Sequence, residues 1–181
     1  MCGADARPVP PLIADLARMG KKIVDITAHD GHLITTRRFA DVLAAAGASG
    51  FTEQPVRSRG SDRPDPGFIW LDITAEWPPL APSSRLERED PCPRCRRAGH
   101  FDVAGGGTRL VSRDVVDTAC DFNVTWEYFG VWRTAMTAAK RMPVGGARWV
   151  IVSERARELF VAHKVKHVSF EPLEFERGGP A

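Results

Sequence analysis

The segment TTRRFADVLAAAGASGFTEQPV, residues 35–56, aligns without a gap with VSERARELFVAHKVKHVSFEPL, residues 152–173. The second residue of each segment, Thr36 or Ser153, is a hydroxyl residue suited to capping a helix; apolar residues at helical spacing and a strand-like run follow. Three residues are identical at the offset of 117 that joins the segments: Arg38 and Arg155, Ala45 and Ala162, Pro55 and Pro172. Chance similarity of two amphipathic helices would explain the helical matches, but not the aligned cap, strand and proline. The alignment therefore predicts two related strand-helix-strand units, at about 22–57 and 148–175.

Local signals predict the elements of the first half. Apolar residues at near-helical spacing predict a short helix over 11–19, and Asp30-Gly31 predicts a hairpin between two apolar runs. A hydroxyl cap at one end and a glycine at the other predict a helix over 36–46. Strands are predicted over 51–56 and 68–73, on either side of a polar, turn-rich loop.

The second half is expected to be β-rich before it reaches the second unit. Three prolines at 78, 79 and 82 mark a linker, and a C-x-x-C knuckle and a hairpin around the glycines 105–107 follow it. The further predicted elements are a β-rich stretch over 122–129, a strand over 149–152, a helix over 153–162 and a strand over 168–175. We expect an α+β fold with an N-terminal half, 1–80, and a second half, 81–181, that can together form one compact domain.

The composition limits the classes of partner. With 181 residues and 43% hydrophobic content, the chain can bury a core. Its 25 Lys and Arg nearly balance its 23 Asp and Glu, so no broad field draws it to nucleic acid or to an anionic membrane. No apolar stretch is long enough for a signal peptide or a membrane span, and four cysteines suit a reducing compartment better than a disulfide framework. We expect a cytoplasmic protein whose partner is a protein or a small molecule.

One cysteine pair has the spacing of a metal knuckle. Cys92-Pro-Arg-Cys95 can present two thiolates to one tetrahedral zinc ion, and His100 and Cys120 are the candidates that would complete a structural set of four. Plain thiols are the main alternative. A redox dithiol is a third, although thioredoxin-like cysteines lie at a strand-to-helix junction, whereas proline and arginines surround this pair.

Nothing in the sequence resembles a complete enzyme active site. His29 and His32 have the chemistry to bind a metal or move a proton, but they flank a predicted turn, and no acid or nucleophile is paired with them in sequence. The glycines 105–107 lack the Gly-Lys-Ser/Thr ending of a phosphate loop. We therefore expect no catalytic residue and no enzymatic activity.

Aromatic residues gather before the second unit, at Trp126, Tyr128, Phe129 and Trp132. Aromatic side chains serve as core or as anchors of an interface. A strand here would carry aromatic residues on both faces, which a sheet with one buried face does not require. We therefore expect Trp126, Tyr128 and Trp132 to contribute to partner binding.

A recognisable order of motifs runs from about residue 86 to 175. The motifs are Cys92-Pro-Arg-Cys95-Arg96, the Asp121-Phe122 segment with Gly130, Trp149-Val-Ile-Val-Ser-Glu-Arg155, and Val168-Ser-Phe-Glu-Pro172-Leu173. This order resembles the double-CXXCG motif family of bacterial immunity proteins, known from myxobacterial toxin-immunity systems. Arg96 stands where the family motif has glycine, and only Cys2-Gly3 corresponds to its first C-x-x-C-G. The resemblance implies a small cytoplasmic protein that neutralises a cognate toxin by binding it.

Two functions from different classes follow from the sequence. The first is a non-catalytic immunity protein that neutralises a cognate bacterial toxin by direct binding. The alternative is a zinc-knuckle accessory or regulatory module that assists a partner enzyme or binds nucleic acid. Metal content and salt-sensitive binding to nucleic acid discriminate between them.

Overall fold

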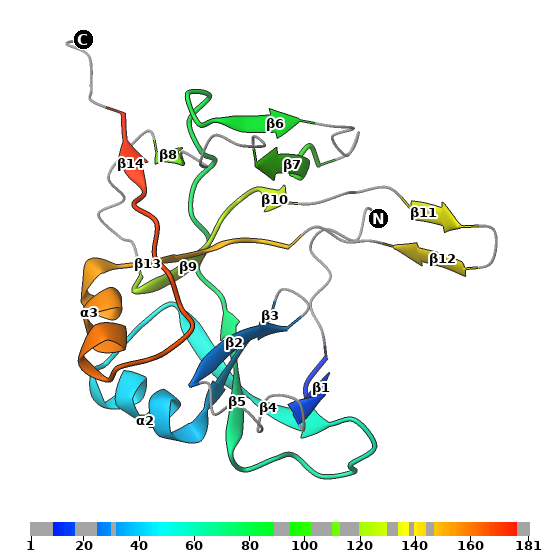
Figure 1. The fold of residues 1–181 in the computed structure, drawn as a ribbon, viewed down its shortest axis with the longest axis vertical. Helices are drawn as coiled ribbons and strands as arrows, with labels where there is room; N and C mark the ends of the chain where they lie inside the picture. Colours follow the sequence, from blue (N-terminus) through cyan, green and yellow to red (C-terminus); the bar gives the residue numbers. More distant parts are fainter. Residues whose placement is uncertain are drawn as a thin grey trace.

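The computed structural model describes residues 9–16, 25–29, 32–88, 95–102, 110–112, 120–129, 134–137, 140–143 and 147–176. In this part of the chain the fold is mixed α+β, with many short strands and two helices that lie side by side (Figure 1). None of the described helices has the length and apolar character needed to cross a membrane.

The first half forms a five-stranded sheet in the order β1-β4-β5-β3-β2. Its elements are β1 (Leu12–Ala14), β2 (Ile26–His29), β3 (His32–Thr36), α2 (Arg37–Ala45), β4 (Phe51–Ser58) and β5 (Phe68–Ile73). The central strand, β5, pairs antiparallel with both β3 and β4, whereas β1 pairs parallel with β4. The helix α2 therefore leaves the sheet at the end of β3 and returns the chain to it at β4.

Short strands and a second helix make up the rest of the described chain. They are β6 (Leu86–Arg88), β7 (Ala98–Asp102), β8 (Val111–Ser112), β9 (Phe122–Val124), β10 (Tyr128–Phe129), β11 (Thr134–Thr137), β12 (Lys140–Pro143), β13 (Val150–Val152), α3 (Glu154–Ala162) and β14 (Glu174–Phe175). A three-stranded sheet has the order β10-β7-β6, and three two-stranded sheets pair β11 with β12, β13 with β9, and β14 with β8.

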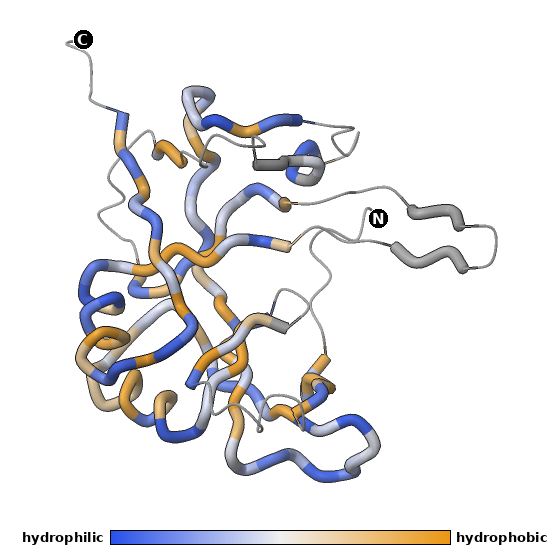
Figure 2. The backbone as a smooth tube through the Cα atoms, viewed as in Figure 1, coloured by the Kyte–Doolittle hydropathy of each residue, from blue (hydrophilic) through white to orange (hydrophobic). Residues whose placement is uncertain are grey.

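The largest hydrophobic core joins the two halves. It contains Phe39 and Leu43 of α2, Ile69 and Leu71 of β5, and also Phe122, Ala156 and Phe160 from beyond residue 81. The rings of Phe39 and Phe160 meet edge to face, 5.0 Å apart. Hydrophobic residues run along β13 and the central strands, and hydrophilic residues lie on the outer turns of the helices (Figure 2). The predicted halves 1–80 and 81–181 thus pack against each other through one core.

Similar hydrogen bonds precede the two helices, with donors 117 residues apart and acceptors, Asp25 and Asp121, 96 residues apart. The N–H of each cap residue donates to an aspartate carbonyl, Thr36 to Asp25 at 2.8 Å and Ser153 to Asp121 at 2.9 Å. Each cap hydroxyl also donates to the carboxylate of that aspartate, at 3.3 Å in the first half and 2.7 Å in the second. An arginine in the first turn of each helix forms an ion pair with the same carboxylate: Arg38 in α2 and Arg155 in α3.

The helix ends correspond in the same way. The N–H of Ala48 donates to Leu43 O, and the N–H of Val165 donates to Phe160 O, both at 2.9 Å. The backbone then turns left-handed twice in each half, at Gly47 and Gly50 and at Lys164 and His167. These contacts and left-handed residues are the described features that 36–50 and 153–167 have in common.

Beyond that point the two halves differ. Residues 51–58 form β4 along their whole length, whereas 168–173 form no strand and only Glu174–Phe175 pair, as β14. The predicted strand over 168–175 is therefore wrong for its first six residues. The physical reason is that β4 has β5 as a partner, whereas no described residue makes a backbone hydrogen bond to 168–173.

The other local predictions have mixed outcomes. The hairpin is confirmed by the pairing of His29 with His32, and the helices over 36–46 and 153–162 are confirmed within one residue at either end. The helix predicted over 11–19 is wrong at 12–14, which form β1. The predicted glycine hairpin falls on 105–107, outside the described residues, and the described partners of β7 are β6 and β10.

Candidate functional site

Asp121 connects the second unit to the end of α2. Its buried carboxylate accepts hydrogen bonds from Ser49 N at 3.0 Å, from Ser49 Oγ at 3.2 Å and from Ser153 Oγ at 2.7 Å, and it forms an ion pair with Arg155. Arg155 also donates to Ala46 O at 2.9 Å and to Gly47 O at 3.2 Å. The guanidinium therefore links β9 to the carbonyl end of α2, where a positive charge is favourable.

These contacts determine the charge of Asp121. Burial raises the pKa of the carboxyl, but the hydrogen bonds from Arg155, Ser153 and Ser49 outweigh burial and lower the pKa to about 2. Asp121 is therefore ionised over the physiological range. Its contacts hold β9 and β13 in position, and the surface described next projects from the turn after β9.

An arginine-aromatic cluster lies at that turn and consists of Glu76, Arg97, Trp126, Tyr128 and Arg148. The Arg97 guanidinium lies over the rings of Trp126 and Tyr128, 5.3 Å from each centroid, and that of Arg148 lies 5.4 Å from the centroid of Tyr128. These distances are within the range of cation–π attraction. Trp126 and Tyr128 are both half-buried, so their rings remain partly accessible to a partner.

Glu76 and backbone carbonyls hold the two guanidinium groups of the cluster. Arg97 and Arg148 both form ion pairs with Glu76 Oε2, at 2.5 and 2.6 Å. Arg97 Nε donates to Trp126 O at 2.9 Å, and Arg148 Nε donates to Thr125 O at 2.5 Å. Burial lowers the pKa of Arg148, and the carboxylate of Glu76 opposes that effect. The cluster is thus a fixed surface of two cations, one anion and two aromatic rings.

Glu127 lies between the two aromatic residues in sequence but points into the protein. It is 4% exposed, and its Oε1 accepts a hydrogen bond from Leu80 N at 2.8 Å. Its buried Oε2 has no hydrogen-bond partner among the described residues. Burial raises the pKa of this carboxyl. The contact with Leu80 attaches the 77–81 segment to the turn that carries Trp126 and Tyr128.

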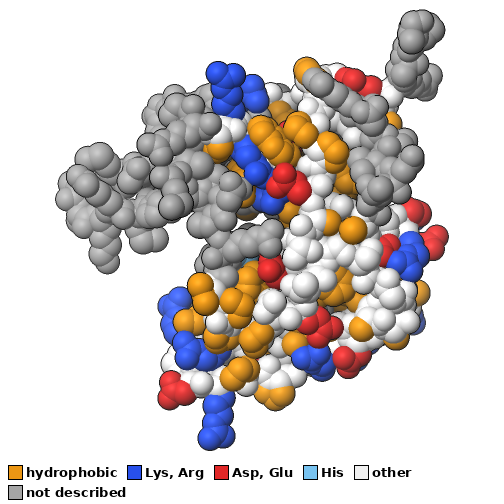
Figure 3. All heavy atoms as spheres, turned by 180° about the vertical axis from the view of Figure 1, so that it is seen from behind, with side chains coloured by type: hydrophobic (Ala, Val, Ile, Leu, Met, Phe, Trp, Pro, Cys, Tyr) orange, Lys and Arg blue, Asp and Glu red, His pale blue; other side chains and the backbone are white. Residues whose placement is uncertain are grey.

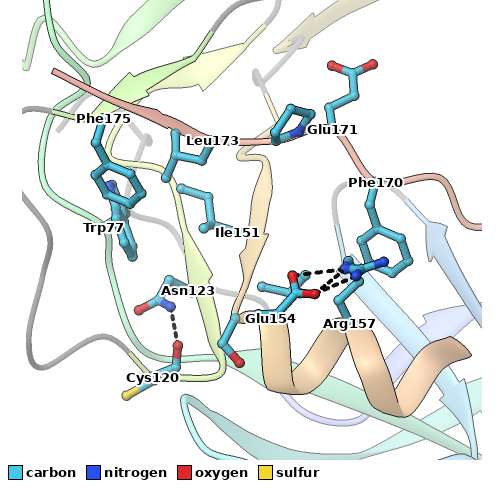
Figure 4. Close-up of a pocket in the computed structure, with 13 residues that line it drawn as sticks. Trp77, Cys120, Asn123, Ile151, Glu154, Arg157, Phe170, Glu171, Leu173 and Phe175 are labelled. Atoms are coloured by element: carbon cyan, nitrogen blue, oxygen red, sulfur yellow. Dashed lines mark hydrogen bonds and ion pairs between the residues drawn. The ribbon is translucent and has the colours of Figure 1, made fainter. Parts of the chain in front are cut away.

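A pocket of about 600 Å³ lies beside β13. β13 contributes Ile151 and Val152 to the lining, and the segment 170–175 contributes Phe170, Leu173 and Phe175. Figure 4 shows Leu173 next to Ile151. The described residues that line the rest are Trp77, Cys120, Asn123, Ser153, Glu154, Arg157, Glu171 and Pro172. At one end Glu154 and Arg157 form an ion pair, so the charges on that rim cancel.

The structure describes only some of the predicted site residues. Of the predicted partner-binding residues, Trp126 and Tyr128 lie together in the arginine-aromatic cluster, and Trp132 falls outside the described residues. Phe129 is core: it is 7% exposed and its ring stacks on Trp149 with centroids 4.0 Å apart. The ring of His32 contacts the edge of Trp70, 5.3 Å away, which places it beside the first sheet.

The predicted zinc ligands are described in part. Cys92 lies outside the described residues, and His100 lies in β7, where only the backbone is described. Cys120 has a free thiol and lines the pocket, and Cys95 is not among the described lining residues. No group of three or more His, Cys, Asp or Glu in this part of the chain is arranged to hold a metal ion. Two described thiols supply half of the donors that tetrahedral zinc needs, so the zinc site stays a prediction.

Two members of the cluster were not singled out from the sequence. Glu76 follows the predicted strand 68–73, and Arg148 precedes the predicted strand 149–152. No motif connects positions so far apart along the chain. Only the pairing of β9 with β13, together with the bridge between Glu76 and Val124, brings them together.

The chain was compared with protein-family models, with curated proteins and with solved structures. No family model matches it, no curated protein matches it, and no solved structure matches it.

Proposed function

We propose that this chain is a non-catalytic binding protein, most concretely an immunity protein of the double-CXXCG type that neutralises a cognate bacterial toxin by contact. The observation that carries the proposal is the arginine-aromatic cluster, in which half-buried Trp126 and Tyr128 are held by Arg97 and Arg148. Tryptophan, tyrosine and arginine are the residues that most often dominate the binding energy of protein interfaces.

The charge of the cluster favours a protein partner over nucleic acid. Glu76 pairs with both arginines, whereas a phosphate-binding surface presents its cations without such a carboxylate. The face of the molecule opposite to that of Figure 1 carries hydrophobic side chains mixed with charges of both signs (Figure 3). A mixed surface of this kind is typical of protein interfaces.

The proposal also includes a common origin for the two strand-helix-strand units. The similar hydrogen bonds support this origin: those after the helices match at an offset of 117 for donor and acceptor, and those before the helices match at 117 for the donors. Duplication of a small unit is a simple route to a binding scaffold with one joint core.

The structural zinc site forms a further part of the proposal. Arg96 has a φ of 57°, the left-handed conformation that glycine adopts most readily, and it occupies the place of glycine in the family's C-x-x-C-G motif. The turn after Cys95 therefore has the backbone conformation that this glycine would allow. Zinc bound by Cys92, Cys95, His100 and Cys120 would connect this turn to the start of β9, and elemental analysis of the purified protein measures its content.

Co-expression with the product of an adjacent toxin-like gene tests the function. We expect the chain to restore growth and to co-purify with the toxin. Replacing both aromatic residues, Trp126→Ala with Tyr128→Ala, should weaken the complex by about tenfold or more, because each ring contributes on the order of 1–2 kcal/mol at such a surface.

A matched control separates binding from folding. Val161→Ala changes another exposed apolar side chain, 61% exposed on α3, and should leave both growth and affinity unchanged. The melting temperature of each variant shows whether it remains folded. Failure of the parent chain to restore growth would contradict the immunity function, and salt-sensitive binding to nucleic acid would favour the accessory-module alternative.

A further inference from the structure

The strand order of the first sheet recurs in the second half with one place left open. In the first half β5 lies between β4 and β3, in the order β1-β4-β5-β3-β2. In the second half β8 pairs with β14, and β13 pairs with β9. No described strand lies between β14 and β13. If β14 corresponds to the end of β4 and β13 to β3, the open place is that of β5.

The outer pairs match in register, which supports this correspondence. In the first half Arg57 is opposite Ile13, and the N–H of Arg59 donates to Ala14 O at 3.1 Å. In the second half Glu174 is opposite Val111, and the N–H of Glu176 donates to Ser112 O at 2.8 Å. Arg57 and Arg59 correspond to Glu174 and Glu176 at the same offset of 117 that relates the helices. Both pairs are parallel.

The pocket described above occupies the open place, which we call the slot: the space between β13 and residues 170–175. Its volume is about 600 Å³, and its lining includes Ile151 and Val152 of β13 and Phe170, Leu173 and Phe175 of the other segment. Figure 4 shows the chain of 170–175 crossing above β13, with Leu173 and Ile151 between the two backbones. The slot therefore has β13 on one side and residues 170–175 on the other, of which Glu174–Phe175 form β14.

One wall of the slot offers backbone hydrogen bonds. The N–H of Thr125 donates to Trp149 O, and the N–H of Ser153 donates to Asp121 O, so alternate residues of this segment point toward β9. Because backbone groups alternate in direction along an antiparallel strand, those of Val150 and Val152 point away from β9, toward the slot. The corresponding residues of β3 are Leu33 and Thr35, which are opposite Leu71 and Ile69 of β5.

The other wall is similarly open. No described residue makes a backbone hydrogen bond to 168–173, whereas the corresponding stretch of β4 pairs with β5 from Phe51 to Pro55. The side chains that face the slot are mainly apolar, and Arg157 on its rim is held by Glu154. A ligand strand with apolar side chains could therefore form backbone hydrogen bonds to both walls, one along each of its edges.

We infer that the slot accepts an extended apolar strand from a protein partner, which would run antiparallel to β13 and complete a second five-stranded sheet. The template is β5, FIWLDI, whose Trp70 and Leu71 are 2% and 1% exposed between its neighbours. A second copy of this chain is a poorer donor. Its described strand of this composition is β5 itself, which is already paired on both edges.

The test uses a synthetic peptide with the sequence of residues 67–74, GFIWLDIT, flanked by lysines for solubility and labelled at one end. We expect saturable binding at one peptide per chain, measured by fluorescence anisotropy. Hydrogen exchange at the amides of Val150 and Val152 should slow by about tenfold or more, because both become hydrogen-bonded. Exchange at Leu33 should not change, because β5 already pairs with it.

Two controls test whether binding depends on backbone hydrogen bonds and whether it takes place in the slot. A peptide N-methylated at its Ile69 and Leu71 positions keeps every side chain but loses the donors that face β13, so its affinity should fall by about tenfold or more. In the protein, Phe175→Glu changes a 44% exposed residue lining the slot and should weaken binding, whereas Val161→Glu, at a 61% exposed position elsewhere on the surface, should not.

Three outcomes would overturn the inference. They are absence of saturable binding, equal affinity of the N-methylated peptide, and a dimer of the chain alone in which Val150 and Val152 are already protected. The last would show that a second copy fills the slot. The slot contains neither Trp126 nor Tyr128, so a failed peptide leaves the toxin co-expression result standing, and a failed rescue leaves peptide binding standing.

Discussion

Two pairs of residues, each 117 apart, adopt the left-handed backbone conformation that glycine tolerates best. Gly47 and Lys164 both adopt a left-handed φ, as do Gly50 and His167. A Cβ added at Gly47 would meet nothing within 4 Å, whereas one at Gly50 would lie 1.9 Å from Phe122 O. Gly47 is therefore required by conformation alone, whereas Gly50 is required by conformation and by a close neighbour as well.

Substitutions at these turns should have graded effects on the free energy of unfolding. Lys164→Gly should raise it by roughly 1 kcal/mol, because the left-handed conformation costs about this much for a residue with a Cβ. Gly47→Ala should lower it by about the same amount, and Gly50→Ala by more than roughly 3 kcal/mol, since the Cβ would overlap backbone. Urea denaturation measures all three, and a loss at Gly50→Ala no larger than at Gly47→Ala would contradict the close contact.

At the scale of elements, Asp121 joins β9, α3 and the turn after α2. Its pKa of about 2 lies below the usual value of 3.8, so its ionised form stabilises the fold. The stabilisation is complete above the unfolded pKa and is lost as the pH falls through the folded pKa of about 2. Asp121→Asn should therefore cost about 2 kcal/mol at pH 7, and this difference should shrink between pH 4 and pH 2.

Urea denaturation at a series of pH values tests this dependence. Asp41→Asn is the matched control, because Asp41 has a side chain that is 66% exposed and lies 4.0 Å from Arg37 in a surface pair. Exposed pairs of this kind contribute about 0–1 kcal/mol. If the loss of unfolding free energy caused by Asp121→Asn stayed constant down to pH 2, the ionised carboxylate of Asp121 would not be the source of the stabilisation.

Elements with strong local signals were predictable, and those defined by distant partners were not. Helix α2 has a cap, a regular apolar spacing and a terminal glycine, and each of these acts within a few residues. The segment 12–14 has a similar apolar content, yet it forms β1 because β4 pairs with it and buries Leu12 and Ala14 while Ile13 stays 48% exposed. That alternation is too short to distinguish from helical spacing in the sequence.

The candidate site was predictable in part for the same reason. Trp126 and Tyr128 stand out as clustered aromatic residues, and the structure places both in the arginine-aromatic cluster. Glu76 and Arg148 give no local signal, because their meeting depends on how β9 and β13 pair. The slot was not predictable either, because it lies between β13 and residues 170–175, and no local pattern shows how these two segments are arranged in space.

At the scale of the whole molecule, the shared core predicts how the chain unfolds. Phe122 is fully buried and contacts the rings of Phe51 and Phe160, with centroids 5.2 and 6.2 Å away, so it touches both halves. We expect the protein to unfold in a single calorimetric transition. Phe122→Ala should lower the stability by about 3–5 kcal/mol and keep the transition single.

The contrasting result would be two separate transitions of which Phe122→Ala moves only one. That behaviour would show that residues 1–80 and 81–181 unfold independently despite their contact. Phe175→Ala is a suitable comparison, because this ring is 44% exposed and its removal should change the transition temperature much less.

The positions of two tryptophans have a practical consequence. Trp70 lies in the small core beneath β1 and β4, and Trp77 lies in the separate core that Leu80 and Phe129 share. Both indoles are shielded from water. Among the described hydrogen bonds of these two tryptophans, Trp77 Nε1–H donates to Ser112 Oγ at 3.1 Å. The molecule thus carries a native optical reporter in each of its smaller cores. Because Trp126, Trp132 and Trp149 also emit, the signal of one core is the difference between the emission of the parent chain and that of a variant with phenylalanine in place of that core's indole.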